Sequence, residues 1–467
     1  MGDLEEQNER VVPRPLPDGV NQDEITQLHV TETLYNAGAR ADNTTWCPCA
    51  WSSDCMYLAH SSGRTGSEVV LVPWNRYKCC LVSTDAYTSD GHVLQLKERR
   101  FNAGEMICSL TFGSSVAETR PGSTQLDWSR YKYRQMQGLI IAAGTRSGQI
   151  RVWSIDEGAD INPMILMDHQ KLVSDLKFAP DGSLRLLSGS YDGSLKVWNL
   201  KDDGNMFPTL RGKDIDGNQY RKFYSISWSP NCKLVCGVGT ASGVFVWNLE
   251  TRKGSKFRFD GQEVRGHLHD VLSCDFSPDG ALLVTSSRDT KILVWNPYTG
   301  DALRQLLHLH PPPTIAFAGG ASNSYVRGVS FSHDGRHVAS ICDDGYLRVW
   351  DVFQADIPEA LASIPEGLCC SYSPHGATLL VGSGDKKVHV LQAPMRVSTL
   401  RHYCRVALCR VFEHGNLTLL GIQPSLLHYL EYVDFDSEAI PPLKERMHHF
   451  KPLRQTYSEK PLNNGHM

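Results

Sequence analysis

Residues 276–295 read FSPDGALLVTSSRDTKILVW, and the order of elements in this stretch decides the fold. A strand ends in the tight turn that Pro278, Asp279 and Gly280 favour, an alternating strand and a second turn follow, and a third strand ends at Trp295. The turn phrase recurs in three variants, each followed by a strand that ends in Trp: FAPDG at 178–182, WSPN at 228–231 and FSHDG at 331–335. The chain therefore repeats one small β unit.

Six tryptophans end the third strand of such a unit: Trp74, Trp153, Trp198, Trp247, Trp295 and Trp350. From Trp153 onward they lie about 45 to 55 residues apart, at or above the roughly 40 to 45 residues of a WD-repeat blade. A seventh, degenerate unit has its turn at residues 370–376 and Leu391 in place of Trp. This repeat resembles that of WD-repeat propellers, which implies an all-β, seven-bladed WD40 β-propeller over residues 24–393. We expect residues 24–36 to help close the ring, because stacked blades stabilise one another only in a closed circle.

The same resemblance implies a hydrogen-bonded set inside a blade, made of a His, a turn Asp, a Ser or Thr, and the Trp. The structural blade residues would include Asp192, Trp198, His267, Asp289, Trp295, Asp344 and Trp350. Because these residue types recur at fixed positions in the repeat, we interpret them as blade architecture and not as a catalytic triad. The sequence also has no phosphate-binding loop of the Walker type. It therefore predicts no enzyme, no cofactor and no metal site.

The hydrophobic pattern changes after the last predicted strand, from a period of two to a period of 3.6. Leu400, Cys404 and Leu408 are spaced i, i+4 and i+8, so they form one stripe of a helix. A second short helix is predicted over residues 424–432, where a proline suits the first turn. Residues 394–436 are therefore predicted to form a small α-helical unit.

This unit resembles a SOCS box, because Thr399, Leu400, Cys404 and Leu408 match the elongin-binding helix of that family residue by residue. The resemblance implies that the apolar stripe binds a groove of elongin C, and through it the chain binds elongin B. Leu400 would be the main anchor. Cys404 would fill a space that is too small for a bulky side chain.

The SOCS-box resemblance also implies attachment to a cullin-RING module. The residues that would make weak contacts with a cullin are Leu420, Ile422, Leu426, Leu427 and Leu430. SOCS boxes that recruit cullin five usually carry a Leu-Pro-apolar-Pro element, whereas residues 420–423 here are Leu-Gly-Ile-Gln. Because both prolines are missing, the sequence supports elongin binding more firmly than cullin recruitment.

Three segments permit a second interpretation. His402, Cys404, Cys409 and His414 are alternative zinc ligands, but one helical face cannot direct all of them to one ion.

Residues 112–138 mix aromatic and basic side chains. Such a mixture suits a nucleic-acid or acidic partner, but we favour an extended strand at the propeller edge. Residues 308–320 contain three consecutive prolines and are expected to form a stiff, exposed loop, either a spacer or a ligand for aromatic grooves.

The overall composition restricts the partners. The chain has 467 residues, 41% hydrophobic and 21% charged, and a formal net charge of -4, which gives no attraction to nucleic acid or anionic membranes. Residues 1–23 have no apolar signal core, and no stretch reaches the roughly 20 apolar residues of a membrane span. We therefore expect a flexible segment at 1–23, a disordered tail at 437–467, reduced cysteines, and an intracellular location in the cytoplasm or nucleus.

A propeller followed by a SOCS box is the arrangement of the WD repeat and SOCS box-containing family, which this chain resembles over nearly its whole length. The resemblance implies a non-catalytic substrate-recognition subunit of an elongin–cullin–SOCS-box ubiquitin ligase, in which the propeller binds an unknown target protein. The alternative is a protein-interaction scaffold without a ligase role. A propeller enzyme is a more distant third hypothesis, and would require a ligand or metal in the central channel.

Overall fold

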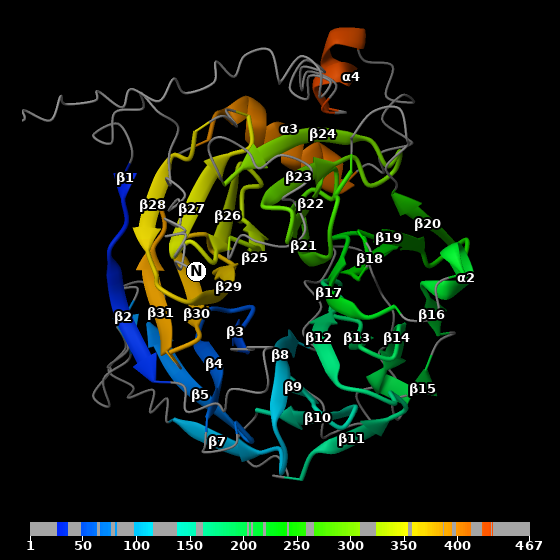
Figure 1. The fold of residues 1–467 in the computed structure, drawn as a ribbon, viewed down its shortest axis with the longest axis vertical. Coiled ribbons are helices and arrows are strands. Elements are labelled where there is room, and N and C mark those ends of the chain that lie inside the picture. Colours follow the sequence, from blue (N-terminus) through cyan, green and yellow to red (C-terminus); the bar gives the residue numbers. More distant parts are fainter. Residues whose placement is uncertain are drawn as a thin grey trace, which may run out of the picture.

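The computed structural model describes residues 26–35, 48–62, 66–75, 80–81, 98–114, 138–155, 162–202, 205–206, 209–217, 221–240, 242–257, 266–308, 324–353, 357–385, 387–394, 398–411, 423–430 and 432. The predicted flexible segment 1–23 and tail 437–467 lie outside these residues. The described strands form seven sheets around a central channel, as the sequence predicted (Figure 1). Each sheet is one blade, and the strand nearest the channel is the one that begins the blade's own segment of the chain. In two blades a strand from the N-terminus is added at the outer edge.

The first four blades follow one another along the chain. Blade one contains β3 (Cys49–Trp51), β4 (Tyr57–Ser62), β5 (Glu68–Asn75), β6 (Cys80–Leu81) and β7 (Arg99–Asn102). Blade two contains β8 (Ile107–Ser114), β9 (Leu139–Thr145), β10 (Gln149–Ser154) and β11 (Met164–Met167). Blade three contains β12 (Val173–Phe178), β13 (Arg185–Ser190), β14 (Ser194–Asn199), β15 (Asn205–Met206) and β16 (Leu210–Arg211), with the short helix η2 (Leu200–Asp202) after β14. Blade four contains β17 (Phe223–Trp228), β18 (Leu234–Gly239), β19 (Val244–Asn248) and β20 (Lys253–Phe257), preceded by helix α2 (Lys213–Asp216).

The last three blades complete the ring with help from the N-terminus. Blade five contains β21 (Val271–Phe276), β22 (Leu283–Ser287), β23 (Lys291–Trp295) and β24 (Ala302–Leu307). Blade six contains β25 (Val326–Phe331), β26 (His337–Cys342), β27 (Tyr346–Asp351) and β28 (Ala360–Ser363), with β1 (Thr26–Gln27) parallel to β28. Blade seven contains β29 (Gly367–Tyr372), β30 (Thr378–Ser383) and β31 (Lys387–Gln392), and β2 (Val30–Tyr35) pairs antiparallel with β31. The ring is thus closed by hydrogen bonds between segments from opposite ends of the propeller.

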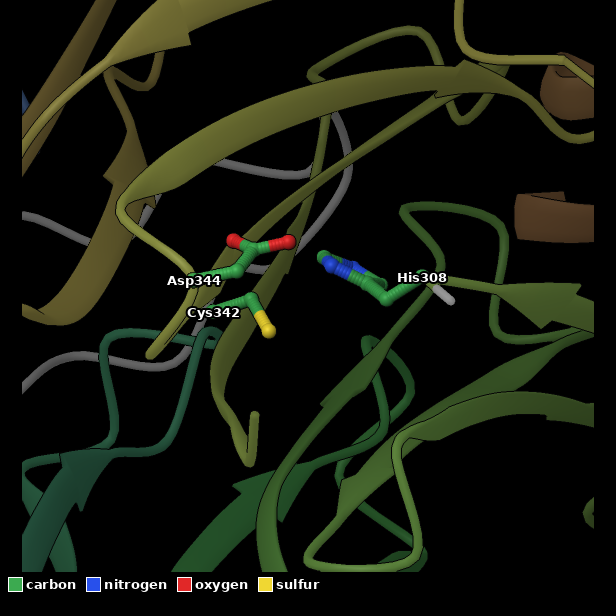
Figure 2. Close-up of side chains that lie close together, drawn as sticks. All are labelled: His308, Cys342 and Asp344. Atoms are coloured by element: carbon green, nitrogen blue, oxygen red, sulfur yellow. The ribbon is translucent and has the colours of Figure 1, made fainter. Parts of the chain in front are cut away.

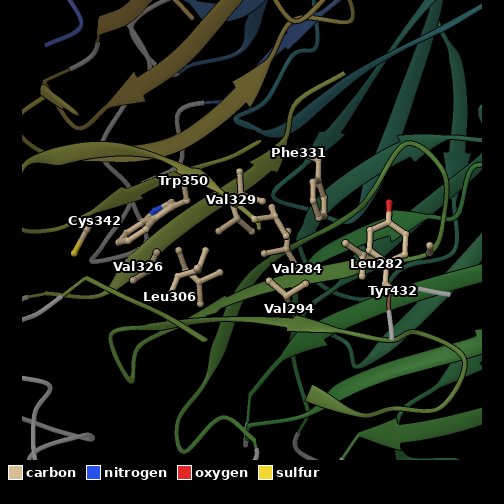
Figure 3. Close-up of a cluster of buried hydrophobic side chains, with 14 residues drawn as sticks. Leu282, Val284, Val294, Leu306, Val326, Val329, Phe331, Cys342, Trp350 and Tyr432 are labelled. Atoms are coloured by element: carbon tan, nitrogen blue, oxygen red, sulfur yellow. The ribbon is translucent and has the colours of Figure 1, made fainter. Parts of the chain in front are cut away.

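The hydrophobic core consists of layers between neighbouring blades. One layer joins blades five and six and includes Val284, Val294, Val329 and Trp350, all at most 4% exposed (Figure 3). Similar clusters lie at the other blade boundaries. Each blade therefore buries both of its faces against its neighbours, as an isolated small sheet cannot do.

The shape of the Ser-Pro-Asp-Gly turns is determined by residues within the turn itself. In blade five, Gly280 has φ 72°, a left-handed conformation that glycine adopts without steric cost. The backbone N–H of Gly280 donates to the carbonyl of Ser277 over 2.8 Å, and the hydroxyl of Ser277 donates to Asp279 over 2.5 Å. These turns join the first and second strands of their blades and so lie on the same face of the ring.

Two helices follow the propeller, α3 (Leu400–Val411) and α4 (Pro424–Leu430). Figure 1 shows α3 lying along one side of the ring beside blades five and six, with α4 next to it. The first helix begins after Thr399, whose carbonyl accepts the backbone N–H groups of His402 over 2.9 Å and Tyr403 over 3.1 Å. Among the described residues, no helix has both the length and the hydropathy that crossing a bilayer requires.

Candidate functional site

The predicted blade sets lie where their strands bring them together. In blade five, His267 contacts Asp289 over 3.0 Å through Nδ1 and Thr285 over 2.7 Å through Nε2, and the indole N–H of Trp295 donates to the same hydroxyl over 2.7 Å. Burial acts to raise the pKa of Asp289, but the neighbouring His267 outweighs it, and the pKa is lowered. All four side chains are buried, so the set ties strands together.

Blade three repeats this arrangement. His169 contacts Asp192 over 2.8 Å and Ser188 over 2.7 Å, and the indole N–H of Trp198 donates to Ser188 over 2.8 Å. Lys196, two residues before Trp198, forms an ion pair with Asp168. Because the same bonds occur in two blades, their geometry fits an architectural role.

Blade six contains a variant of the set. His308 contacts Ser340 over 2.8 Å, and the indole N–H of Trp350 donates to Ser340 over 2.8 Å. Instead of meeting Asp344 directly, His308 Nδ1 accepts a hydrogen bond of 2.8 Å from Arg348, which also bonds Asp344 over 2.6 Å. His308 is fully buried, so the prediction of an exposed loop was wrong at this residue. Residues 309–320 of that predicted loop lie outside the described chain.

His308, Cys342 and Asp344 lie close enough together to suggest a metal site (Figure 2). However, the buried guanidinium of Arg348 bonds both the imidazole and the carboxylate, and its positive charge opposes a metal cation. Burial also raises the pKa of Cys342, which keeps this thiol protonated and a poor ligand. We therefore interpret this set as a blade variant, with Arg348 as the structural residue that the sequence analysis missed.

The outward side of α3 carries three of the four residues predicted to bind elongin. Leu400 is 79% exposed, Cys404 is exposed and Leu408 is half-buried. Tyr403, which lies on the same side, is 40% exposed. Thr399 is exposed and accepts the backbone N–H of His402 at its hydroxyl over 3.3 Å, so it caps the helix. An apolar stripe thus faces outward, available to a partner.

The inward side of α3 packs against the propeller. His402, Arg405 and Val406 are at most 6% exposed, and Cys409 is half-buried. His402 contacts the carbonyl of Asp334 over 2.7 Å through Nε2. The binding surface on the propeller is the Ser-His-Asp-Gly turn of blade six and the Ser-Pro-Asp-Gly turn of blade five, which we call the docking turns (332–335 and 277–280).

Two further polar contacts hold the first helix to the docking turns. The hydroxyl of Ser398 donates to the carboxylate of Asp334 over 2.7 Å, and Arg410 Nε donates to the carbonyl of Pro278 over 3.0 Å. Burial acts to raise the pKa of Asp334, but the hydrogen bonds from Ser332, Ser398 and the backbone of Arg336, together with the neighbouring His337, outweigh it, and the pKa is lowered. The ionised form of Asp334 is therefore the form that suits this interface.

An aromatic cluster binds the second helix to the first. The guanidinium of Arg405 lies 3.4 Å from the ring centre of Tyr429, 4.2 Å from that of Tyr432 and 5.4 Å from that of Phe353, which follows β27 in blade six. Such stacking is worth about 2 kcal/mol or more where water is excluded, and Arg405 is 2% exposed. A single arginine thus links both helices to the propeller.

Tyr432 extends this interface into the hydrophobic core. It is 2% exposed and belongs to the cluster between blades five and six (Figure 3). Its hydroxyl donates to Asp279, in the docking turn of blade five, over 2.5 Å. Burial and the neighbouring Asp279 raise the pKa of the Tyr432 phenol, so it stays protonated as a donor. The C-terminal helices and the propeller therefore share one core.

The residues predicted to contact a cullin differ in their positions. Leu426 is 42% exposed and Leu427 is half-buried, whereas Leu430 is 1% exposed. In this arrangement α4 turns Leu430 inward, and its contact with a cullin stays a prediction. Leu420 and Ile422 lie outside the described residues.

The alternative zinc site does not form among the described residues. Cys404 faces outward, while His402 contacts the carbonyl of Asp334 and the thiol of Cys409 donates to the carbonyl of Leu430 over 3.6 Å. His414 lies outside the described residues, as do residues 115–137 of the predicted aromatic and basic segment.

The comparisons with known proteins agree with this architecture. The family model for the WD domain, G-beta repeat, matches residues 163–199, 261–296, 313–351 and 365–391. A chain in the crystal structure of a mitotic checkpoint complex resembles the fold with a TM-score of 0.55 and 16% identity, covering 79% of this chain and 96% of that chain.

The curated relatives match far beyond the repeats. WD repeat and SOCS box-containing protein 1 of Homo sapiens is 39% identical over 434 residues, covering 89% of this chain and 99% of the relative. The protein of the same name from Danio rerio is 38% identical over 438 residues, covering 89% of this chain and 98% of the relative. Together with the seven-bladed propeller and the docked helical pair, this similarity shows that the chain belongs to the WD repeat and SOCS box-containing protein family.

Proposed function

We propose that this protein is the substrate-recognition subunit of an elongin–cullin–SOCS-box E3 ubiquitin ligase. The observation that carries the proposal is the outward stripe of α3, where Leu400 is 79% exposed on a helix whose opposite side is buried against the propeller. A single exposed leucine is common on protein surfaces and needs no explanation. Here, however, the exposed leucine is one of the residues that match an elongin-binding helix. The printed names of the relatives, which contain a SOCS box, support the same assignment.

Binding of elongin C would follow helix-in-groove recognition. Thr399, Leu400, Cys404 and Leu408 would face the groove, and full burial of Leu400 would contribute about 1.5 to 3 kcal/mol. The helix does not need to fold on binding, because the docking turns already hold it. Less conformational entropy is then lost than when a disordered peptide binds.

The contribution of this subunit to ubiquitin transfer would be proximity. Holding a target protein on the propeller near a charged conjugating enzyme raises the effective concentration of its lysines, so the chain needs no catalytic residue of its own. The buried His–Asp–Ser/Thr–Trp sets have structural partners that account for them. We place this activity inside the cell, in the cytoplasm or nucleus, without nucleic acid or membrane as partners.

Cullin recruitment is the second part of the proposal. Residues 420–423 lack the two prolines of the Leu-Pro-apolar-Pro element, and Leu430 faces inward. Of the described leucines of α4, Leu426 and Leu427 are at least partly accessible. We propose cullin five as the partner, with weaker binding than a proline-bearing SOCS box would give.

Coexpression with elongins B and C tests the proposal. The wild-type chain should retain both proteins through purification, and Leu400→Asp should lose both, because a charge cannot enter an apolar groove without a large penalty. Met167→Asp is the matched control, since Met167 is 69% exposed on β11 of blade two, and it should retain both. If the wild type retains neither elongin, the ligase proposal fails and the interaction scaffold becomes the better account.

A further inference from the structure

Two cysteines meet where the ring closes. Cys49 lies on β3, the inner strand of blade one, and Cys369 lies on β29, the inner strand of blade seven. Their Sγ atoms are 3.7 Å apart, although the residues are separated by 320 positions in the sequence. Both side chains are half-buried, and the two strands that carry them lie next to the central channel (Figure 1). A disulfide needs the sulfurs at about 2.05 Å, so rotation of the two side chains would have to bring them closer.

Charged side chains lie on the inner strands near this pair. Lys177 and Asp175 lie on β12 of blade three, and Asp275 lies on β21 of blade five. Burial acts to lower the pKa of Lys177, but Asp175 and Asp275 outweigh it, and the pKa is raised. Lys177 is therefore a cation at neutral pH and favours negative charge in the channel.

The pKa of Cys369 is shifted in the opposite direction from the pKa values of Cys108 and Cys232. The hydrogen bond from Cys49 is the main cause that lowers the pKa of the Cys369 thiol, and the backbone of Gly382 and the charge of Lys177 add to it. Burial and Asp175 act in the opposite direction. By contrast, burial raises the pKa of Cys108 to about 12 and that of Cys232 to about 11. The lowered pKa favours the thiolate of Cys369, which is the reactive form of cysteine, beside the thiol of Cys49.

We propose that Cys49 and Cys369 form an oxidisable thiol pair, a modification site for small hydroperoxides, whose disulfide joins blade seven to blade one. In the first step the Cys369 thiolate attacks one oxygen of hydrogen peroxide. The O–O bond breaks, hydroxide leaves, and the sulfur is oxidised to a sulfenic acid. In the second step Cys49 attacks that sulfur. The S–S bond forms, the S–O bond breaks, and the departing hydroxide takes the Cys49 proton as water. A dithiol reductant reverses the reaction.

The position of the disulfide determines its effect. The propeller is closed by the pairing of β2 with β31, and β2 precedes blade one in the chain. Opening the ring must separate these two strands. A bond between β3 and β29 spans the same seam, so the oxidised ring is closed covalently. Linking residues so distant in sequence restricts the unfolded chain, which raises thermal stability.

The experiment uses the full-length chain treated with hydrogen peroxide at a small molar excess. Digestion without reductant should yield a crosslinked peptide pair that contains Cys49 and Cys369, lighter by two hydrogens, and dithiothreitol should remove it. The midpoint of thermal unfolding should rise by several degrees on oxidation. In Cys49→Ser, a cyclic 1,3-dione should instead trap the sulfenic acid at Cys369, and the midpoint should not rise.

Cys370→Ser is the matched control, because Cys370 is the half-buried neighbour of Cys369 on the same strand, and it should crosslink like the wild type. The crosslink needs only the wild-type chain, so the test stands even if a variant fails to fold. Absence of the Cys49–Cys369 peptide, or a crosslink that leaves the unfolding midpoint unchanged, would overturn the proposal. Elongin binding is measured separately, so failure here does not affect the proposed function.

Discussion

The two sides of α3 have opposite surroundings. On the outward side Leu400 and Cys404 face solvent, and their residue types match a helix that binds another protein. On the inward side His402 and Arg405 are buried and contact the propeller of the same chain. One helix therefore has two partners, and a substitution on one side should affect binding while one on the other side should affect docking.

The buried inward side of α3 explains why the helical pair has a defined position on the propeller. A SOCS box on a flexible linker would let the target and the ligase core move independently. Here Tyr432 and Ser398 bond the docking turns and Arg405 stacks on Phe353 of blade six, so the orientation of the helical pair relative to the propeller is fixed by packing. A fixed orientation would keep a bound target at a constant distance from the ubiquitin-carrying enzyme.

The largest expected effect is at Tyr432. Tyr432→Ala should remove about 3 to 5 kcal/mol of the free energy that holds the helices on the propeller, because it leaves a cavity in the core between blades five and six. Hydrogen exchange of the backbone at residues 398–411 should speed up strongly. Tyr432→Phe is the matched control and should lose only about 1.5 kcal/mol, the hydrogen bond to Asp279. Equal exchange in all three proteins would contradict the shared core.

Arg405 should have the next largest effect. Arg405→Ala removes the stacking on Tyr429 and Tyr432 and should cost about 2 kcal/mol of docking free energy. Arg405→Lys keeps the charge but not the planar group, so it should recover only part of the loss. Limited proteolysis between the propeller and α3 would report both effects. If lysine restores full protection, the planar stacking is not what holds the helices.

Asp334 should give the smallest effect, a loosening at acid pH. Its folded pKa is lowered, so its contribution is present above the unfolded value of about 3.9 and is lost as the pH falls through the lower folded value. Protection of the amides at residues 398–411, taken as the intrinsic exchange rate at each pH divided by the observed rate, should therefore fall as the pH is lowered from about 5 to about 3.

Asp334→Asn controls for the effects of other polar groups beside this carboxylate, including His337 and His402. Its docking should be weaker at neutral pH and should change less on acidification than that of the wild type. A variant with the same acid response as the wild type would show that other carboxylates dominate.

The outward side of α3 could be predicted from the sequence, but the inward side could not. The spacing of Leu400, Cys404 and Leu408 is a local pattern, and so are the turns and tryptophans that define the blades. By contrast, the partners of Arg405 and Tyr432 depend on Phe353 and Asp279, which only the tertiary fold brings near them. No local pattern marks such contacts in advance.

Two errors have the same origin. His308 was expected in an exposed loop because three prolines follow soon after it, yet it directly follows β24 and takes the position of the blade histidine. Its bond to Arg348 was missed because Arg348 replaces the usual direct contact between His and Asp. An arginine two residues before the Trp, like Lys196 before Trp198, was the available signal.

The most direct test of the two-sided helix is the affinity of the purified elongin B–C complex for the wild-type chain and Leu400→Ala, measured beside the thermal unfolding of each free chain. Loss of about 1.5 to 3 kcal/mol should weaken the Kd by roughly 10- to 100-fold. The unfolding midpoint should not change, because Leu400 is 79% exposed and supports no core. An unchanged Kd, or a lowered midpoint that accounts for the weaker binding, would contradict the proposal that the outward side exists to bind elongin.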